Sequence, residues 1–359
     1  MKTTLLKQFF LLAPALLLAG CGGDAGSGST AAPAMAGGAG TAQEVVSCPS
    51  DPGITYICGL LNAEDLLSVG DTGMILTSGM NGEDVTGHLY LVNPLDDTWE
   101  ELVFGPNFSQ QLDAAMFPAC PGPMDVNNFS AHGLALKATG DSTFDLYITS
   151  HGGREAIEIF TLDLSAGFAA LTWKGCVTLD PTIMHNSVAI LPDGGFVTTE
   201  FMHWDGGIGE VFGGTPNGGV IAWHPGSEPA LIPGTMVSGP NGIVVSEDAR
   251  YMFVAAFGSR ELVRFDLSQD PVAKDSVALD VTLDNIRWGA PGKLLTAGGN
   301  ASGEGWSVVE VDATTLEPVT VGSFGADVAM QGVSSALQIN NELWVGTFNG
   351  DRIGYFDRQ

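Results

Sequence analysis

Short apolar runs, separated by glycine, asparagine, aspartate and proline, follow one another along most of the chain. HLYLVNP, DLYITSHGG and GVIAWHPG are typical, since each is apolar or alternating over only a few positions. Such runs predict strands, and no long stretch shows the 3.6-residue period of an amphipathic helix. From about residue 45 to residue 359 the pattern therefore predicts an all-β protein.

The predicted strands recur in a layout that repeats six times. Each unit has an apolar strand, a polar turn, a second strand that often ends in a small residue, and a third strand. The six third strands read LYLVNP, IEIFTLDL, VIAWHP, LVRFDL, SVVEVDA and RIGYFDR. Such repeats are typical of radial β folds, which protect the edges of their sheets. We predict a six-bladed β-propeller of four-stranded blades over 45–359, closed by an N-terminal strand that pairs with the last blade.

Polar residues stand where the first strand of each unit begins. The predicted starts lie near Glu64, His132, Asn186, Asn241, Asn285 and Ser335. In a propeller the innermost strand of every blade lines the central channel, so these residues would face the same end of it. A single asparagine in such a place is ordinarily a turn residue. Several at one level instead predict a shared site.

Carboxylate and amide oxygens dominate this predicted ring. They come from four units, in the residues Glu64, Asn186, Asn241, Asp284 and Asn285. Oxygen donors of this kind suit Ca²⁺, which takes about six to eight of them. We therefore predict a central calcium site, the alternative for each side chain alone being a turn or a hydrogen-bonded loop.

The first 20 residues have the features of an export signal. Two lysines precede an apolar run that is too short for a membrane span, and the run ends in Leu18-Ala19-Gly20-Cys21. This ending resembles the bacterial lipobox, which implies cleavage before Cys21 and diacylation of that cysteine. Residues 21–44 are mostly small and predict a flexible linker. We expect an exported protein that is lipid-anchored to the bacterial outer membrane, on its periplasmic or its surface face.

The formal net charge of the chain is −28 at pH 7, which limits the classes of partner that it is expected to bind. Contacts with phosphate need lysine and arginine, so nucleic acid is not expected as a partner. Electrostatic docking to anionic lipid is disfavoured too, which leaves the lipid anchor as the expected link to a membrane. Adaptation to salty surroundings and attraction of cations both agree with the acidic excess.

Four cysteines remain besides Cys21, and an even number in an exported protein predicts disulfides. Three connectivities are open. We favour a local bond between Cys48 and Cys58, and a bond between Cys120 and Cys176 that joins neighbouring modules. The chain has no CxxC pattern, so a zinc site is not expected.

Several motifs also carry a likeness to a known family. AHG at 131–133, LYITSH at 146–151, PNG at 240–242 and LDN at 283–285 occur in the order found in the paraoxonase/arylesterase family. The likeness covers nearly all of 60–359 and extends to the wider gluconolactonase and strictosidine-synthase-like propellers. It implies a six-bladed, calcium-dependent hydrolase that acts on a small lactone or aryl ester.

The resemblance also implies roles for single residues. The ligands of the catalytic calcium fall on Glu64, Asn186, Asn241, Asp284 and Asn285. The histidine of the HG motif falls on His132, and the second histidine of the proposed dyad falls on His151. An aspartate of the family's structural calcium matches Asp65, but Ser187 replaces its companion aspartate, so a tight second calcium near Asp65 is not expected.

His132 is the expected general base, because an unperturbed imidazole titrates near pH 6.5. His151 follows a turn at 138–142, so it would lie on the adjacent strand and orient His132. The chain has no GxSxG elbow, which argues against a serine esterase. The alternatives that stay open are two structural histidines in a non-enzymatic ligand- or protein-binding propeller, and a strictosidine-synthase-like enzyme.

Overall fold

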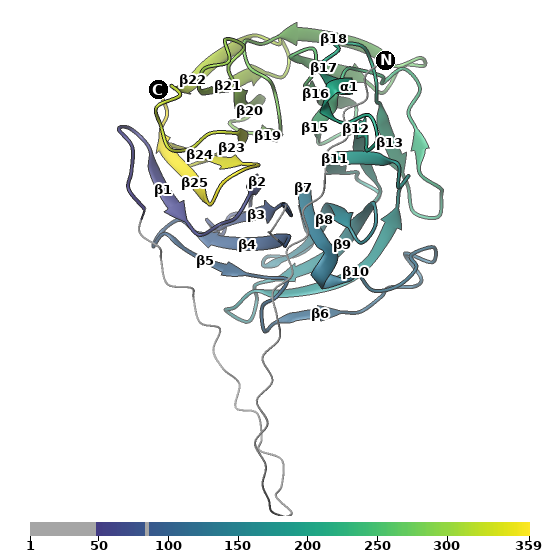
Figure 1. Cartoon of the computed structure of the whole chain (residues 1–359). Helices are drawn as coiled ribbons and strands as arrows, with labels where there is room; N and C mark the ends of the chain where they lie inside the picture. Colours follow the sequence, from purple (N-terminus) through teal and green to yellow (C-terminus); the bar gives the residue numbers. More distant parts are fainter. Residues whose placement is uncertain (1–47, 83–85) are drawn as a thin grey trace, which may run out of the picture. The chain divides into compact units, whose positions relative to one another are not determined.

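Six β-sheets are arranged around a common axis in the computed structural model, which describes residues 48–82 and 86–359 (Figure 1). Five of the sheets have four strands and one has five. The predicted all-β, six-bladed propeller is therefore confirmed. Within the described part of the chain the helical elements are one short helix, α1 (Ile208–Val211), and one 3-10 turn, η1 (Val126–Asn128).

The strands of each blade follow one another outward from the axis. Blade 1 contains β2 (Ala63–Ser68), β3 (Ile75–Gly79), β4 (His88–Asn93) and β5 (Thr98–Glu101). Blade 2 contains β7 (Phe129–Ala138), β8 (Thr143–Gly152), β9 (Ala156–Asp163), β10 (Ala170–Thr178) and, at its outer edge, β6 (Phe108–Gln110). Blade 3 contains β11 (Ile183–Ile190), β12 (Phe196–His203), β13 (Val220–Trp223) and β14 (Ala230–Leu231).

The other three blades complete the circle. Blade 4 contains β15 (Pro240–Val245), β16 (Tyr251–Ala256), β17 (Glu261–Asp266) and β18 (Ala273–Ala278). Blade 5 contains β19 (Ile286–Trp288), β20 (Lys293–Gly299), β21 (Trp306–Asp312) and β22 (Pro318–Phe324). Blade 6 contains β23 (Val333–Ile339), β24 (Glu342–Thr347), β25 (Arg352–Asp357) and, outermost, β1 (Thr55–Cys58).

The circle is closed by the pairing of β1 with β25. The two strands are antiparallel, with Thr55 opposite Tyr355 and Cys58 opposite Arg352. The last blade thus takes its outermost strand from the N-terminal side, as predicted. Hydrogen bonds between distant parts of the sequence hold the first and last blades together.

The six predicted third strands are β4, β9, β13, β17, β21 and β25, so the repeat was assigned correctly. In three blades the aspartate that ends this strand also forms the next turn. Asp163, Asp266 and Asp312 each accept a hydrogen bond from the backbone N–H two residues later, at 2.8, 3.0 and 2.9 Å. This turn chemistry explains why the FDL-like pattern marks the end of a third strand.

Apolar side chains fill the space between neighbouring sheets. The second strands are apolar on both faces because each sheet has another blade on either side, and β16 is buried from Met252 to Ala256. Trp173, Trp306 and Trp344 are fully buried. This packing holds the inner strands in place around the axis.

Blade 2 departs from the expected four strands. β6 adds a fifth strand, parallel to β10, from the insertion between blades 1 and 2. Both predicted disulfides are present, Cys48–Cys58 and Cys120–Cys176. Cys176 lies on β10 and Cys120 in the connection between β6 and η1, so the second bond fastens this connection to blade 2 instead of joining two blades.

The N-terminal predictions lie outside the described residues. They concern the export signal at 1–20, the lipidation site Cys21 and the linker at 21–44, and they stay predictions. Over 48–82 and 86–359, no helix has the length and apolar character that crossing a membrane would require.

Four innermost strands carry the same irregularity. In β2, β7, β11 and β15, two consecutive residues lie opposite a single residue of the second strand. These two-residue bulges are Glu64-Asp65, His132-Gly133, Asn186-Ser187 and Asn241-Gly242. A β-bulge bends its strand and re-aims a side chain, and bulges are common beside active sites. The repeated bulge therefore brings four polar residues to one level.

Hydroxyl groups on the second strands hold these bulges in shape. Ser78 Oγ accepts from Asp65 N at 3.0 Å, and Thr199 Oγ1 accepts from Ser187 N at 3.1 Å. Thr199 Oγ1 also donates to the backbone oxygen of Asn241, at 2.7 Å, and so links blades 3 and 4. Backbone groups that the bulge removes from the β-ladder are satisfied in this way.

Glycine at the second bulge position lets neighbouring blades approach closely. A Cβ atom on Gly133 would lie 2.5 Å from both the backbone oxygen of Asn186 and the Cα of Ser187. A Cβ on Gly242 would lie 2.5 Å from the backbone oxygen of Asp284. At these two points the inner strands meet backbone to backbone, which leaves no room for a side chain.

We expect Gly133→Ala to lower the free energy of unfolding by about 3 kcal/mol, the upper range for overpacking against a rigid backbone. Gly299→Ala is the matched control, because a Cβ at that strand position has no heavy atom within 4 Å, and its cost should stay below about 1 kcal/mol. Chemical denaturation measures both values. Equal costs for the two variants would contradict the close approach of the blades.

Candidate metal and catalytic site

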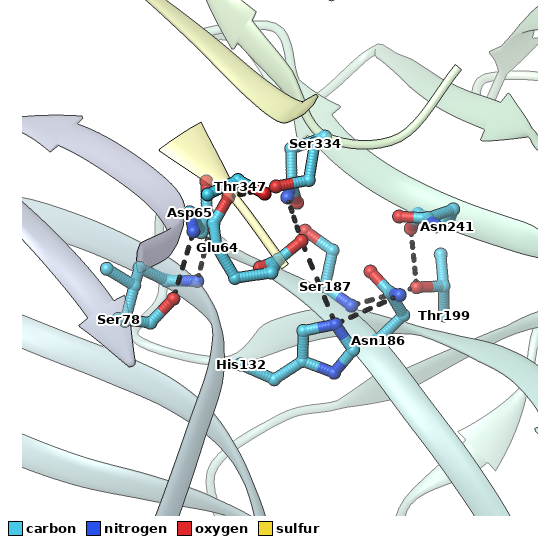
Figure 2. A network of polar contacts seen from close by, with 12 residues as sticks. Glu64, Asp65, Ser78, His132, Asn186, Ser187, Thr199, Asn241, Ser334 and Thr347 are labelled. Atoms are coloured by element: carbon cyan, nitrogen blue, oxygen red, sulfur yellow. Dashed lines mark hydrogen bonds and ion pairs between the residues drawn. The ribbon is translucent and has the colours of Figure 1, made fainter. Parts of the chain in front are cut away.

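Six polar residues lie at one level, on the innermost strands or directly before one, and form what we call the polar ring. They are Glu64, His132, Asn186, Asn241, Asn285 and Ser334, and each is at most 3% exposed. Figure 2 shows Glu64, His132 and Asn186 pointing toward one another. The sequence pattern placed five of the six correctly and missed the sixth by one residue, because the register shift of β23 falls at Ser334 and not at Ser335.

Two asparagines of the polar ring use their amide nitrogens on neighbours. Asn285 Nδ2 donates to Glu64 Oε1 at 2.6 Å, and Asn186 Nδ2 lies 3.2 Å from His132 Nε2. The side chain of Asn241 lowers the pKa of the Asp284 carboxyl group, against the larger effect of burial. These contacts join Glu64 to Asn285 and His132 to Asn186, with Asn241 and Asp284 beside them in the same polar network. The two bonds fix which end of the Asn285 and Asn186 amides is an oxygen.

Four buried oxygens of the network have no hydrogen-bond donor. They are Glu64 Oε2, Asn186 Oδ1, Asn241 Oδ1 and Asn285 Oδ1, one from each of four blades. An unsatisfied buried acceptor costs about 1–3 kcal/mol, so four at one level call for an explanation. Carboxylate and amide oxygens are the donors that Ca²⁺ prefers. The donor set therefore fits a calcium ion.

The carboxyl groups of the network resist ionisation by themselves. Burial raises the pKa of Asp284 to about 7. Burial also raises the pKa of Glu64 well above its usual range, and the charges of Asp284 and Asp65 raise it further. A nearby cation would favour the charged form of both groups.

Amides make up most of this donor set. Among the residues that the structure describes, no three His, Cys, Asp or Glu side chains gather at a point where they would hold a metal ion. Glu64 and Asp284 are the only carboxylates among the five predicted ligands. Such a set suits a hard cation far better than zinc, which prefers nitrogen and sulfur.

The two predicted catalytic histidines are in contact. His132 Nδ1 lies 2.9 Å from His151 Nε2, and His151 is on β8, next to the strand of His132. His132 Nε2 lies 3.9 Å from Glu64 Oε1, so the imidazole borders the ring oxygens. Burial lowers the pKa of His132 well below its usual value, and the charge of His151 adds to the effect. His132 is therefore neutral at physiological pH.

Two further side chains surround this pair. His151 Nδ1 bonds Glu155, at 2.8 Å to Oε1 and 3.0 Å to Oε2. Trp204, which is partly exposed, meets the His151 ring edge to face with centroids 5.6 Å apart. His203 is exposed and instead pairs with Glu210, at 2.9 Å.

Asp65 follows Glu64 in the bulge of β2 and is paired with a buried arginine. Arg287 on β19 contacts the Asp65 carboxylate and donates to the backbone oxygens of Leu66 and Leu134, at 2.9 and 3.0 Å. Asp65 Oδ2 also accepts from Leu134 N at 2.8 Å. The guanidinium group thus connects blades 1, 2 and 5. It supplies the positive charge at the place where the resemblance suggested a second calcium.

Three residues near the polar ring were not predicted from the sequence, namely Arg287, Glu155 and Ser334. Arg287 follows the LDN motif directly, and its signal is a basic residue inside a short strand of an acidic chain. Glu155 lies four residues after His151, on the far side of a turn, a spacing that carries no information by itself. Ser334 differs by one residue from the position that the pattern indicated, and a register shift of this kind leaves no mark in the sequence.

Comparison with known proteins shows the fold. No family model and no curated protein matches the chain. A luciferin-regenerating enzyme is 14% identical, with a TM-score of 0.54 over 85% of this chain and 95% of that one. A calcium-binding protein, regucalcin, from Agrobacterium tumefaciens is 14% identical, with a TM-score of 0.50 over 84% and 91%. The periplasmic gluconolactonase of Pseudomonas aeruginosa is 12% identical, with a TM-score of 0.50 over 83% and 82%.

We expect Arg287→Met to lower the free energy of unfolding by about 3–5 kcal/mol, because it leaves the buried charge of Asp65 without a partner. The double variant Arg287→Met with Asp65→Asn removes that charge and should recover at least half of the loss. Thermal and chemical denaturation of the two variants measure the difference. A double variant no more stable than the single one would show that the ion pair is not what holds this part of the channel.

Proposed function

We propose that the protein is a calcium-dependent hydrolase of lactones or aryl esters. The observation that carries the proposal is the set of four buried oxygens without donors, together with the neutral His132 that borders them. A set of oxygens alone would suit a binding protein. The histidine pair beside them adds a base, which a site for binding alone does not need.

Each group has a part in such a reaction. The ligands of the ion would be Glu64, Asn186, Asn241, Asp284 and Asn285. A bound calcium ion would polarise the ester carbonyl and stabilise the negative charge that develops on its oxygen. Ligand oxygens from four blades would hold that position rigidly, since each residue sits on an inner strand or directly before one.

His132 Nε2 takes a proton from a water molecule, whose oxygen then attacks the carbonyl carbon. The carbon–oxygen bond to the leaving group breaks, and the leaving oxygen takes the proton back from His132. Burial keeps the imidazole neutral and able to accept that proton. Trp204, partly exposed and against His151, provides an apolar surface for the aryl or alkyl part of a substrate.

The fold neighbours agree with this proposal without deciding it. One is named as a gluconolactonase and another as a calcium-binding protein, at 12% and 14% identity. The resemblance of the AHG, PNG and LDN motifs to the paraoxonase/arylesterase family points to the same chemistry. Diacylation of Cys21 would keep the enzyme at the outer membrane, and mass spectrometry of the mature N-terminus tests that part.

Hydrolysis of a panel of lactones and phenyl esters tests the proposed function. We expect activity on at least one of them that a chelator abolishes and that added calcium restores. Magnesium is the control, because it demands a tighter octahedral site. Bound calcium without hydrolysis of any substrate would favour the non-enzymatic binding propeller. Activity that survives complete removal of metal would exclude the calcium mechanism.

We expect His132→Gln to keep calcium bound while kcat falls by about 10²–10⁴-fold, the usual contribution of a general base. Calorimetric titration with calcium and turnover of the best substrate measure the two effects separately. Asn93→Ala is a suitable control, since Asn93 ends β4 on the outer side of blade 1's second strand and its side chain only accepts from Leu95 N in the following turn. Loss of calcium together with activity would place His132 among the ligands instead.

The pH dependence of the hydrolysis rate follows from the protonation of His132. The reaction needs neutral His132, so the rate should fall as pH drops through the pKa of that group in the folded protein. Because this pKa is lowered by burial, the acid limb should lie below pH 6.5, and not at pH 6.5 as an exposed histidine would give. The pH profile of kcat shows where the limb lies, and a limb at or above pH 6.5 would contradict the assignment.

A further inference from the structure

Glu155 lies at the end away from the polar ring in a chain of hydrogen bonds that leads to it. It is 7% exposed, and both of its carboxylate oxygens face His151 Nδ1. His185 on β11 approaches the same carboxylate, with Nδ1 3.8 Å from Oε2. The chain continues from His151 Nε2 to His132 Nδ1 at 2.9 Å and from His132 Nε2 to Asn186 at 3.2 Å. Glu155 thus ends a line of four side chains from blades 2 and 3.

Only one arrangement of protons satisfies every contact along this line while both histidines are neutral. A carboxylate can only accept, so His151 carries its proton on Nδ1 and donates it to Glu155. His151 Nε2 is then an acceptor, which requires the proton of His132 to lie on Nδ1. His132 Nε2 is left unprotonated, and its electron pair accepts from the amide nitrogen of Asn186.

We propose that Glu155 is a positioning residue, which acts through His151 to hold His132 in the tautomer that presents an unprotonated Nε2 to the polar ring. The tautomers stand on the contacts alone, whereas their effect on rate rests on the proposed hydrolysis. Glu155 touches neither the ring oxygens nor the place where a substrate would react. When Nε2 takes a proton, the negative charge of Glu155 also stabilises the positive charge that spreads over the two rings.

A purely structural role for Glu155 makes a different prediction. The carboxylate would then stabilise the fold around the turn after β8, and an isosteric amide that keeps one acceptor oxygen would serve nearly as well. The tautomer role depends on a group that can only accept. Glutamine at this position can turn its NH₂ toward His151 Nδ1, which permits the opposite arrangement of protons in both rings.

Nitrogen NMR of the histidine rings tests the proton arrangement without any substrate. In the metal-free wild-type protein we expect a proton on Nδ1 and none on Nε2 for both His132 and His151. The chain has six histidines, so the resonances of these two can be assigned from the variants His132→Gln and His151→Gln. Wild-type protein with the proton of His132 on Nε2 would overturn the proposal, even if no variant of Glu155 folds.

Glu155→Gln should remove the uniform tautomer of both rings, while Asp193→Asn should leave them unchanged. Asp193 is the matched control because its carboxylate makes the same kind of bond, to His224 Nδ1 at 2.7 Å, on the exposed surface. Melting temperatures of both variants show whether the fold is intact. Unchanged tautomers in folded Glu155→Gln would also overturn the proposal.

Kinetics then show whether the tautomer matters for the reaction. We expect Glu155→Gln to lower kcat about tenfold or more, with KM and calcium affinity within about twofold of wild type. The double variant with His151→Gln should be no slower than His151→Gln alone, because Glu155 acts through that histidine. Additive losses would mean that Glu155 works by another route. If the wild type hydrolyses nothing, the proposed function fails, whereas the NMR result still decides the tautomers.

Discussion

Four buried acceptor oxygens without donors are the constraint around which the centre of this propeller is organised. Each would cost about 1–3 kcal/mol if it stayed unsatisfied, which is a large share of the stability of an ordinary domain. Hydrogen bonds made by other atoms of the same side chains hold these oxygens in place. The amide nitrogens of Asn186 and Asn285 bind His132 and Glu64, so the oxygen ends remain free. A cation that binds oxygen relieves this cost, and folding and metal binding are then coupled.

The residues next to the polar ring also help to hold its oxygens in position. Bulges at equivalent points of four inner strands turn polar residues to one level, and hydroxyl groups such as that of Thr199 satisfy the backbone that the bulges expose. Gly133 allows the next blade to approach this backbone directly. Next to Glu64, Asp65 is paired with Arg287. Asp65 thus has a cation supplied by the protein itself, whereas the four ring oxygens have no donor.

Much of this arrangement was predictable because the propeller is a repeat. Third strands could be recognised from their recurring apolar pattern, and polar residues then stood where the first strand of each unit begins, which located Glu64, His132, Asn186, Asn241 and Asn285. Glu155 and Arg287 could not be found in this way. Arg287 meets Asp65 across 222 positions of sequence, and Glu155 matters only through the orientation of a histidine ring. Contacts of that kind depend on packing across blades, which periodicity does not contain.

The unfolding midpoint as a function of free calcium tests the central claim most directly. If the oxygens of the polar ring hold calcium, the ion stabilises the folded state, by about 2.7 kcal/mol at one hundred times the dissociation constant. The midpoint should rise steadily with calcium, much less with magnesium, and Asn241→Ala should weaken the calcium effect at least tenfold in concentration. A midpoint that does not respond to millimolar calcium, in protein shown to contain no metal, would contradict the account.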